Sequence, residues 1–229
     1  MNPILKEALS SVRALAVLLV LCCVLYPFTV YAIGQTAFSW RANGSLVDKD
    51  GNPTTTPENA AGSRLLGQSF TSSEYFHPRP SAAGAGYDAA SSSGTNLGPI
   101  SDKYLNGLAD DPKTKDVDES FSGIKQLVQA YRQENGLALG ALVPGDAVTR
   151  SASGLDPQIS PRNADLQVAR VAKARGLEEE RVRTLVRAAT DGRGWGLLGE
   201  AGVNVLMLNI SLDKVSNPTP SQNHLAQGS

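Results

Sequence analysis

The stretch ALAVLLVLCCVLYPFTVYAI, residues 14–33, is a run of twenty uncharged, mostly apolar residues near the start of a chain of 229. At a rise of 1.5 Å per residue, a helix of this length spans about 30 Å, the thickness of the hydrocarbon core of a bilayer. The apolar region of a signal peptide is shorter, at about 7 to 15 residues. The run therefore predicts a single transmembrane helix over residues 14–37 that anchors the rest of the chain.

A cleaved signal peptide is the alternative interpretation of the same run. The small residues Ala32 and Gly34 flank Ile33 in the kind of sequence that a signal peptidase cleaves. Cleavage at Gly34 would release a secreted periplasmic hydrolase or solute-binding domain. The intact mass of the native protein distinguishes the two interpretations, because cleavage removes residues 1–34.

The charges beside the run predict its orientation. Lys6 and Arg13 precede it, whereas Arg41 is the only basic residue after it before Lys49. By the positive-inside rule, residues 1–13 form a cytoplasmic tail. The chain then spans the cell inner membrane, and the residues after the span lie on its opposite side, in the periplasm or outside the cell. We thus expect a single-pass protein with an extracytoplasmic accessory domain over residues 38–215 and a disordered tail over residues 216–229.

Composition excludes several function classes. With 21 basic and 22 acidic residues the net charge is -1, which gives no reason to expect a nucleic acid as partner. The only cysteines, Cys22 and Cys23, lie in the apolar run, and the only histidines are His77 and His224, so neither a metal site nor a thiolate nucleophile is predicted. The chain also lacks a phosphate-binding Gly-x4-Gly-Lys-Ser/Thr loop. We therefore expect neither catalytic residues nor a cofactor of its own.

Apolar periodicity predicts an α+β fold for the domain after the transmembrane helix. Helical spacing and capping residues predict three helices, over residues 121–136, 161–175 and 178–189. The composition also predicts an irregular loop, a short strand, and a hairpin that two of the helices cover on one face. These are the loop over residues 77–101, the strand over residues 64–70, and the hairpin that pairs residues 195–198 with a buried strand over residues 203–210.

Two polar, glycine-bearing segments, residues 81–99 and 149–157, allow two interpretations. Glycine permits close approach of backbones, and amide groups at a helix start bind anions or the carbonyl groups of a partner. Ordinary turns and helix caps explain the same residues. Composition alone slightly favours the turns and caps.

These two segments belong to a series that follows the anchor in order along the chain: WRANGSL (40–46), YFHPRPSA (75–82), GTNL (94–97), VTRSASGLD (148–156), RVAKAR (170–175) and VNVLMLNISLD (203–213). As a series, they resemble the C subunit of the bacterial Kdp potassium-transporting ATPase. The chain departs from the family in a longer, more acidic connection over residues 102–120 and in the tail beyond Lys214. Neither departure overlaps a matching segment.

The resemblance implies an accessory subunit, without catalytic activity of its own, in an ATP-driven, high-affinity potassium import complex. Its partners would be a potassium-binding pore subunit and a P-type ATP-hydrolysing subunit. It would assist assembly, and it would shape potassium access or act as a catalytic chaperone that raises the ATP affinity of the ATP-hydrolysing subunit. The residues expected to contact partners are Tyr75, Phe76, His77, Arg79, Asn96 and Leu97.

The resemblance also suggests a nucleotide contact, with ATP held jointly with the ATP-hydrolysing subunit. The candidate residues are Ser151, Ser153, Gly154 and Asp156. The predicted orientation opposes this role, because ATP is cytoplasmic and the domain is expected outside. A structural or potassium-access role at the outer face of the pore subunit is therefore the preferred expectation.

Overall fold

The computed structural model describes residues 2–108 and 121–216. The predicted tail after Ser216, and the part of the acidic connection over residues 109–120, lie outside these residues. The main helices are α1 (Pro3–Leu19), α2 (Tyr26–Ala37), α3 (Ser39–Ala42), α4 (Asp102–Asn106), α5 (Ile124–Glu134), α6 (Gly145–Val148), α7 (Pro161–Arg175), α8 (Glu179–Ala188) and α9 (Val205–Ser216). A π-helical turn, η1 (Val20–Leu25), joins α1 to α2, and the short 3₁₀ helices are η2 (Pro57–Asn59) and η3 (Ala89–Ser91).

Five short strands form two small antiparallel sheets among the described residues. The first sheet pairs β1 (Leu46–Asp48) with β2 (Ala60–Ser63). The second has the order β3-β5-β4 and consists of β3 (Gln158–Ile159), β5 (Gly202–Asn204) and β4 (Thr190–Asp191). The mixture of helices and strands confirms the predicted α+β class.

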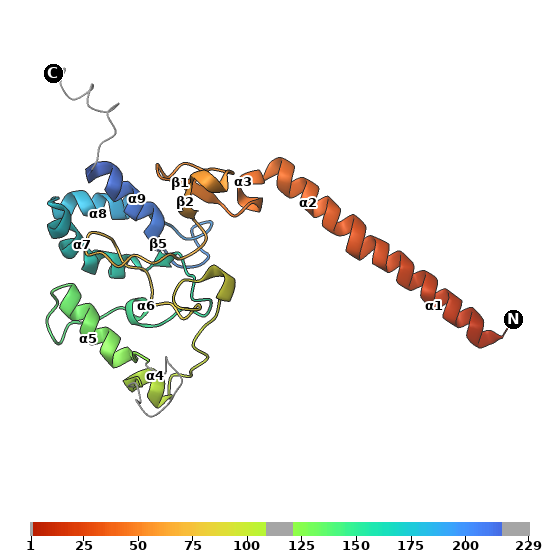
Figure 1. Cartoon of the computed structure of the whole chain (residues 1–229), viewed down its shortest axis with the longest axis horizontal. Coiled ribbons are helices and arrows are strands. Elements are labelled where there is room, and N and C mark those ends of the chain that lie inside the picture. Colours follow the sequence, from red (N-terminus) through yellow and green to blue (C-terminus); the bar gives the residue numbers. More distant parts are fainter. Residues whose placement is uncertain (1, 109–120, 217–229) are drawn as a thin grey trace, which may run out of the picture.

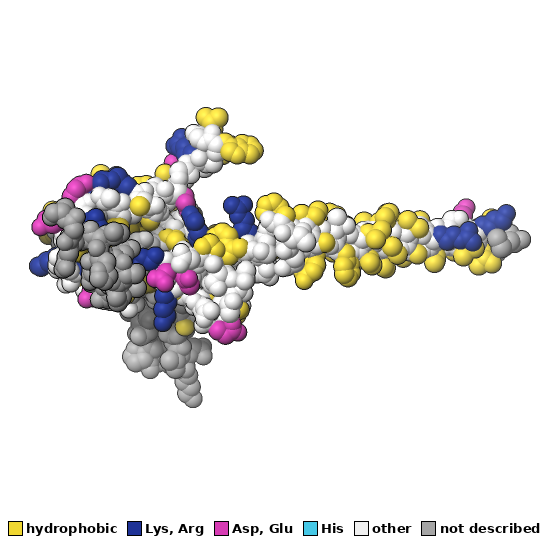
Figure 2. Space-filling model, turned by 90° about the horizontal axis from the view of Figure 1, so that it is seen from above, with side chains coloured by type: hydrophobic (Ala, Val, Ile, Leu, Met, Phe, Trp, Pro, Cys, Tyr) yellow, Lys and Arg dark blue, Asp and Glu magenta, His cyan; other side chains and the backbone are white. Residues whose placement is uncertain are grey.

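The N-terminal helix leaves the rest of the protein and extends away from it (Figure 1). It runs from Pro3 to Ala37 and is, within the part of the chain that the structure describes, the one helix long and apolar enough to cross a membrane. Its apolar side chains are exposed on all sides, and charged side chains gather near its N-terminal end (Figure 2). Because an apolar helix that covers no core requires an apolar medium, this helix confirms the predicted candidate span. Its orientation stays a prediction.

The main core lies where α7, α8 and α9 meet. Its buried residues include Val168 and Val171 from α7, Val182 from α8 and Leu208 and Leu212 from α9. Capping explains the bounds of α7, because the Ser160 hydroxyl accepts from the Asn163 N–H and Gly176 ends the helix at a φ of +64°. The predictions for α5, α7 and α8 are confirmed, with ends that differ by a few residues.

The predicted strand over residues 203–210 is wrong in all but its first residues. Only Gly202–Asn204 is a strand, and α9 follows at once. The Asn204 side chain accepts a hydrogen bond from the Met207 N–H (3.1 Å), which supports the first turn of the helix. The run looks like a buried strand because α9 is apolar on two faces: Leu208 packs in the main core, whereas Leu206 and Ile210 pack against Val47 of β1.

The predicted pairing of residues 195–198 with this strand is also wrong. The partners of β5 are β3 and β4 instead, with Thr190 opposite Val203. Residues 195–198 lie beyond the sheet, in a tip closed by the bridge between Gly194 and Leu198. Residues 195–198 thus belong to the loop that joins β4 to β5 and not to a strand.

The predicted strand over residues 64–70 is wrong as well. The strand lies just before it, at Ala60–Ser63, and residues 64–70 form a turn followed by irregular backbone. There Gly67 donates its N–H to the Leu155 carbonyl (2.7 Å), so the segment bonds to a loop instead of a sheet. The predicted irregular loop over residues 77–101 is confirmed, apart from η3.

Candidate functional site

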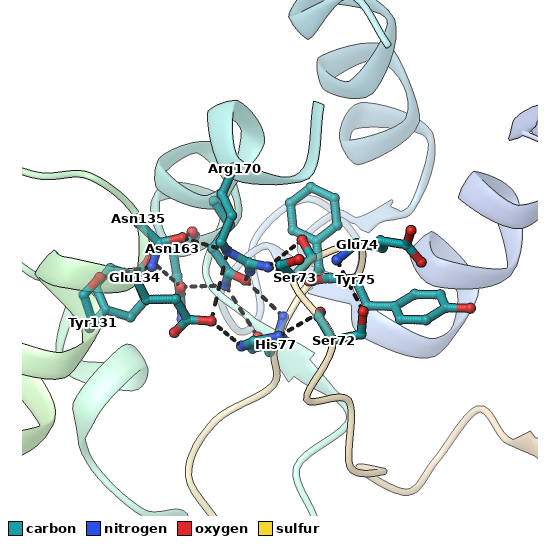
Figure 3. Close-up of polar contacts among 12 residues, drawn as sticks. Ser72, Ser73, Glu74, Tyr75, His77, Tyr131, Glu134, Asn135, Asn163 and Arg170 are labelled. Carbon is teal, nitrogen blue, oxygen red and sulfur yellow. Dashed lines mark hydrogen bonds and ion pairs between the residues drawn. The ribbon is translucent and has the colours of Figure 1, made fainter. Parts of the chain in front are cut away.

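Residues 72–77, hereafter the braced segment, cross the polar side of α7 between α5 and α9 (Figure 3). The segment is anchored by Phe76, whose ring is fully buried in the main core. The amide of Asn209, on α9, pairs with both backbone groups of Phe76: it accepts from the N–H (2.9 Å) and donates to the carbonyl (3.0 Å). This pairing satisfies buried backbone without a sheet.

Arg170 of α7 holds the same segment from the other side. Its guanidinium is 7% exposed and donates to the carbonyls of Ser73 (2.7 Å) and Tyr75 (3.0 Å). It also donates to the side-chain oxygens of Gln167 (2.8 Å) and Asn135 (3.0 Å). Burial lowers the pKa of Arg170, and these four acceptors compensate for the lost hydration of the charge.

Two further polar side chains extend the network along α7. The Gln167 amide accepts from the His77 N–H (2.7 Å) and donates to the His77 carbonyl (3.2 Å). It donates as well to Asn163 (2.9 Å), which accepts from the Tyr131 hydroxyl (2.8 Å) and donates to Asp146 (3.0 Å). Residues spaced by three and four share a helix face, so α7 presents one polar face to α5, α6 and the braced segment.

The ring of His77 lies between a carboxylate and a backbone carbonyl. Its Nδ1 is 2.8 Å from Glu134 Oε1, and its Nε2 is 3.0 Å from the Ser72 carbonyl oxygen. Both partners are hydrogen-bond acceptors, so the ring forms both bonds at once only when each of its nitrogens carries a proton. The hydrogen bond from His77, together with the charges of His77 and Arg170, lowers the pKa of Glu134. Both ring nitrogens therefore have partners within the fold.

An ion pair fixes the start of the braced segment. Arg175, at the end of α7, lies 2.7 Å from Asp213 of α9, and it donates to the Glu74 carbonyl (2.7 Å). The Tyr75 hydroxyl donates to the other oxygen of Asp213 (3.2 Å), and the Arg175 guanidinium lies 4.7 Å from the centre of the Tyr75 ring. Three segments that are far apart in the sequence thus meet at one point.

The two glycine-bearing segments predicted from the sequence lie against each other. Gly154 has a φ of +69°, and a Cβ at this position would lie 2.7 Å from the Ala83 nitrogen and 2.8 Å from the Ser93 oxygen. The Ser81 hydroxyl donates to the Gly154 carbonyl (2.7 Å) and accepts from the Tyr87 N–H (2.9 Å). We call this contact the serine–glycine junction. Here glycine permits close approach of two loops of the same chain.

The predicted nucleotide residues have partners at this junction. Ser151 is 3% exposed, and the Ser153 hydroxyl accepts from the Leu155 N–H (3.1 Å). Asp156 forms an ion pair with Arg79, which is one of the residues predicted to contact a partner. Their use inside the fold explains these residue types without a nucleotide, and the nucleotide contact stays a prediction.

A pocket of about 420 Å³ lies beside this ion pair. The charged residues that line it are Arg79, Asp146, Asp156 and Glu200, which make its charge negative. Such a pocket repels phosphate groups and attracts cations. Within residues 2–108 and 121–216, no group of three or more His, Cys, Asp or Glu side chains is arranged to hold a metal ion.

The structure brings some predicted partner residues together and leaves others apart. Tyr75 and His77 lie in the braced segment on either side of the buried Phe76. Asn96 and Leu97 lie in the long loop instead, where Asn96 is exposed and has a φ of +54°. Whether any of these residues contacts a partner stays a prediction.

Sequence reasoning missed the residues that build the brace. Gln167 and Asn163 each interrupt the apolar stripe of α7, and Asn209 interrupts the apolar run of α9. A polar side chain within an apolar stripe predicts a buried hydrogen-bond partner, because an unpaired buried amide is costly. That signal was present in the sequence, although it does not name the partner.

Comparisons with known proteins agree on one family. The model of the family described as "KdpC: K+-transporting ATPase, c chain" matches residues 8–214. A potassium-transporting ATPase KdpC subunit of Mycobacterium bovis is 45% identical over 92% of this chain and 99% of its own length. KdpC subunits of Myxococcus xanthus and Koribacter versatilis are 47% and 43% identical, over 93% and 94% of this chain and 90% and 98% of their own lengths.

Replacement of Glu134 should reduce stability in a pH-dependent way. Because the pKa of Glu134 is lowered from 4.5 in the folded state, its ionised form contributes stability above that value and loses it as the pH falls through the folded pKa. Glu134→Gln should therefore cost about 0.5–1.5 kcal/mol at pH 6, a value reduced for the partial exposure of the carboxylate. Urea unfolding of the full chain in detergent measures the difference.

The difference between the two proteins should shrink as the pH falls below 4.5. Glu179→Gln is the matched control, since Glu179 pairs with Arg183 on an exposed helix face. Its effect should stay under about 0.5 kcal/mol. A Glu134→Gln cost that does not change with pH would contradict the role given to its charge.

Substitution at the serine–glycine junction should destabilise the fold without any nucleotide present. Gly154→Ala forces a side chain into a left-handed backbone conformation and against the Ala83 nitrogen. We expect a loss of about 1–3 kcal/mol in the free energy of unfolding. The control is Gly140→Ala, where a Cβ has no neighbour within 4 Å; it should change stability by less than about 0.5 kcal/mol. Equal stability of the two variants would show that the junction does not need glycine.

Proposed function

The chain belongs to the KdpC family, the c chain of K+-transporting ATPases, and from this premise we propose how it serves a potassium transport complex. It is a membrane-associated accessory subunit. We propose that it has no catalytic activity of its own and that its α+β domain lies on the extracytoplasmic side. There it assists assembly with a pore subunit and a P-type ATP-hydrolysing subunit, and it shapes the access of potassium to the pore.

The observation that carries this proposal is the engagement of the reactive side chains within the fold. His77 and Glu134 bond to each other, and Arg170 bonds to backbone carbonyls and to amide side chains. Groups held in this way position backbone and do not present a nucleophile or base to a substrate. The arrangement supports a rigid docking module in preference to a secreted hydrolase.

The N-terminal helix supports a role beside the pore and not within it. A single crossing cannot enclose an ion path, because the path needs polar groups that are shielded from lipid. The helix also continues without interruption through Gly34 to Ala37, which supports a retained anchor. Lys6 and Arg13 before the span support an N-terminus in the cytoplasm.

Potassium access is supported by charge. The pocket beside Asp156 is lined by more acidic than basic side chains, and a negative surface raises the local concentration of cations. Partner contacts are best assigned to Asn96, the one predicted contact residue whose side chain is exposed. Phe76 would act by position alone, because its side chain is fully buried.

For the segment over residues 151–156 we propose a structural role instead of a nucleotide contact. Ser153 and Asp156 are engaged within the junction, and the neighbouring pocket repels anions. If the domain is extracytoplasmic, cytoplasmic ATP also lies on the other side of the membrane. A catalytic-chaperone role would then need transmission through the anchor.

Opposite labelling of the two ends tests the orientation. We expect a membrane-impermeant maleimide to label Leu139→Cys in intact spheroplasts, because Leu139 is exposed, and to label Lys6→Cys only after permeabilisation. Both variants are made with Cys22 and Cys23 replaced by alanine. Labelling of Lys6→Cys but not Leu139→Cys in intact spheroplasts would invert the topology and restore access to ATP.

Deletion of the chain tests the accessory role. A strain that keeps the remaining subunits should lose assembled complex and high-affinity potassium uptake, since the domain is proposed to stabilise the assembly. Uptake at limiting potassium and the yield of purified complex are the measurements, and the wild-type chain should restore both. Normal assembly, rate and affinity without the chain would refute the proposal.

A further inference from the structure

The loop between β4 and β5 carries a second apolar feature outside the N-terminal helix. Its residues 194–199, Gly-Trp-Gly-Leu-Leu-Gly, form what we call the apolar tip. Trp195 is 95% exposed, Leu197 83% and Leu198 64%. Figure 2 shows an apolar projection that stands off the domain near the point where the long helix joins it. Large apolar side chains that are exposed together on one loop form the kind of patch that marks an interaction site.

Part of the backbone of the tip is hydrogen-bonded at its base. Gly194 and Leu198 exchange N–H···O bonds (2.8 and 2.9 Å), and the N–H groups of Gly196 and Leu197 donate to Arg193 and Gly194 (3.0 and 3.1 Å). Trp195 itself has a φ of +50°, which is uncommon for a bulky residue. Each backbone group paired in this way lowers the cost of moving the loop toward an apolar medium.

The charges near the tip stay at its base. Arg193 and Glu200 flank the tip and form an ion pair (3.2 Å), and residues 194–199 carry no charged side chain. A protein interface is usually completed by a polar rim. An indole and two leucines with charged side chains only at their base instead match the boundary between headgroups and acyl chains, where tryptophan is enriched.

The base of the loop is tied to the part of the domain from which the helix leaves. Asp191 of β4 forms an ion pair with Arg64 (2.8 Å), which directly follows β2, and Asn204 of β5 donates to the Arg64 carbonyl (2.9 Å). Trp40 of α3 packs in the same cluster as Val47 of β1. In Figure 1, β5 lies on the side of the domain that faces α3 and the end of α2.

We propose that the apolar tip inserts into the lipid interface of the leaflet at which α2 leaves the membrane. The N-terminal helix then attaches the domain to the membrane at one point, and the tip attaches it at a second. The occupant is phospholipid, with the indole of Trp195 at the headgroup boundary and Leu197 among the first acyl carbons. This inference requires that the helix crosses a membrane, but it does not depend on which side the domain lies or on the role in potassium transport.

Quenching by brominated lipids tests the insertion with the full chain in vesicles of phosphatidylcholine and phosphatidylglycerol. Trp40→Phe leaves Trp195 as the only tryptophan. Its fluorescence should fall at least about twofold when lipids brominated near the headgroup replace ordinary lipids, and less when the bromine lies deep in the acyl chain. Flotation with the vesicles shows that the anchor is inserted in every sample.

The control is Leu139→Trp in a chain whose two native tryptophans are phenylalanine. Leu139 is also highly exposed, but it follows α5 on the part of the domain away from the long helix (Figure 1). Its indole should keep its fluorescence in brominated vesicles. Equal quenching of the two positions in floated samples, or none at either, would overturn the proposal without bearing on the transport role.

Photo-crosslinking in the assembled complex shows whether the tip contacts lipid or another subunit. With benzoylphenylalanine at position 195, we expect a product whose mass increases by one phospholipid. The same amino acid at position 139 should give no lipid product. A product at position 195 that contains only another subunit would show that the tip is a subunit contact, and the proposal would be wrong.

Discussion

The polar face of α7 is the feature on which the rest of the domain depends. Asn163, Gln167 and Arg170 are spaced so that one helix face holds α5, α6 and the braced segment together. Each of these side chains is buried or nearly so, and each unpaired buried group would cost about 1–3 kcal/mol. A complete set of partners therefore selects one arrangement of loops that have little regular structure of their own.

The same logic explains how a domain with such short strands stays ordered. The braced segment and the long loop pair with no sheet, so side chains replace the sheet: Asn209 pairs with both backbone groups of Phe76, and Ser81 bonds to Gly154. Close contact at Gly154 then locks two irregular segments without a helix or strand between them. Polar residues that resemble a binding site in the sequence are used here as internal ties.

Regular elements could be predicted from the sequence where local signals agree. Ser160, Pro161 and Gly176 mark the ends of α7, and a one-sided apolar stripe marks its core face. The prediction failed at α9, because Leu208 and Ile210 face two different clusters and the resulting apolar run reads as a strand. The partners of Gln167 and Asn209 could not be predicted, since they lie about 90 and 133 residues away in the chain.

A domain that is attached to the membrane at one point can tilt unless its connection to the anchor is rigid. Residues 38–42 between α2 and the first strand are helical for most of their length and pack through Trp40 against β1. The helix is thus joined to the domain by a short, structured connection in place of a flexible linker. A second contact at the apolar tip would oppose the remaining rotation, so the two apolar features together would set the height and tilt of the domain relative to the membrane.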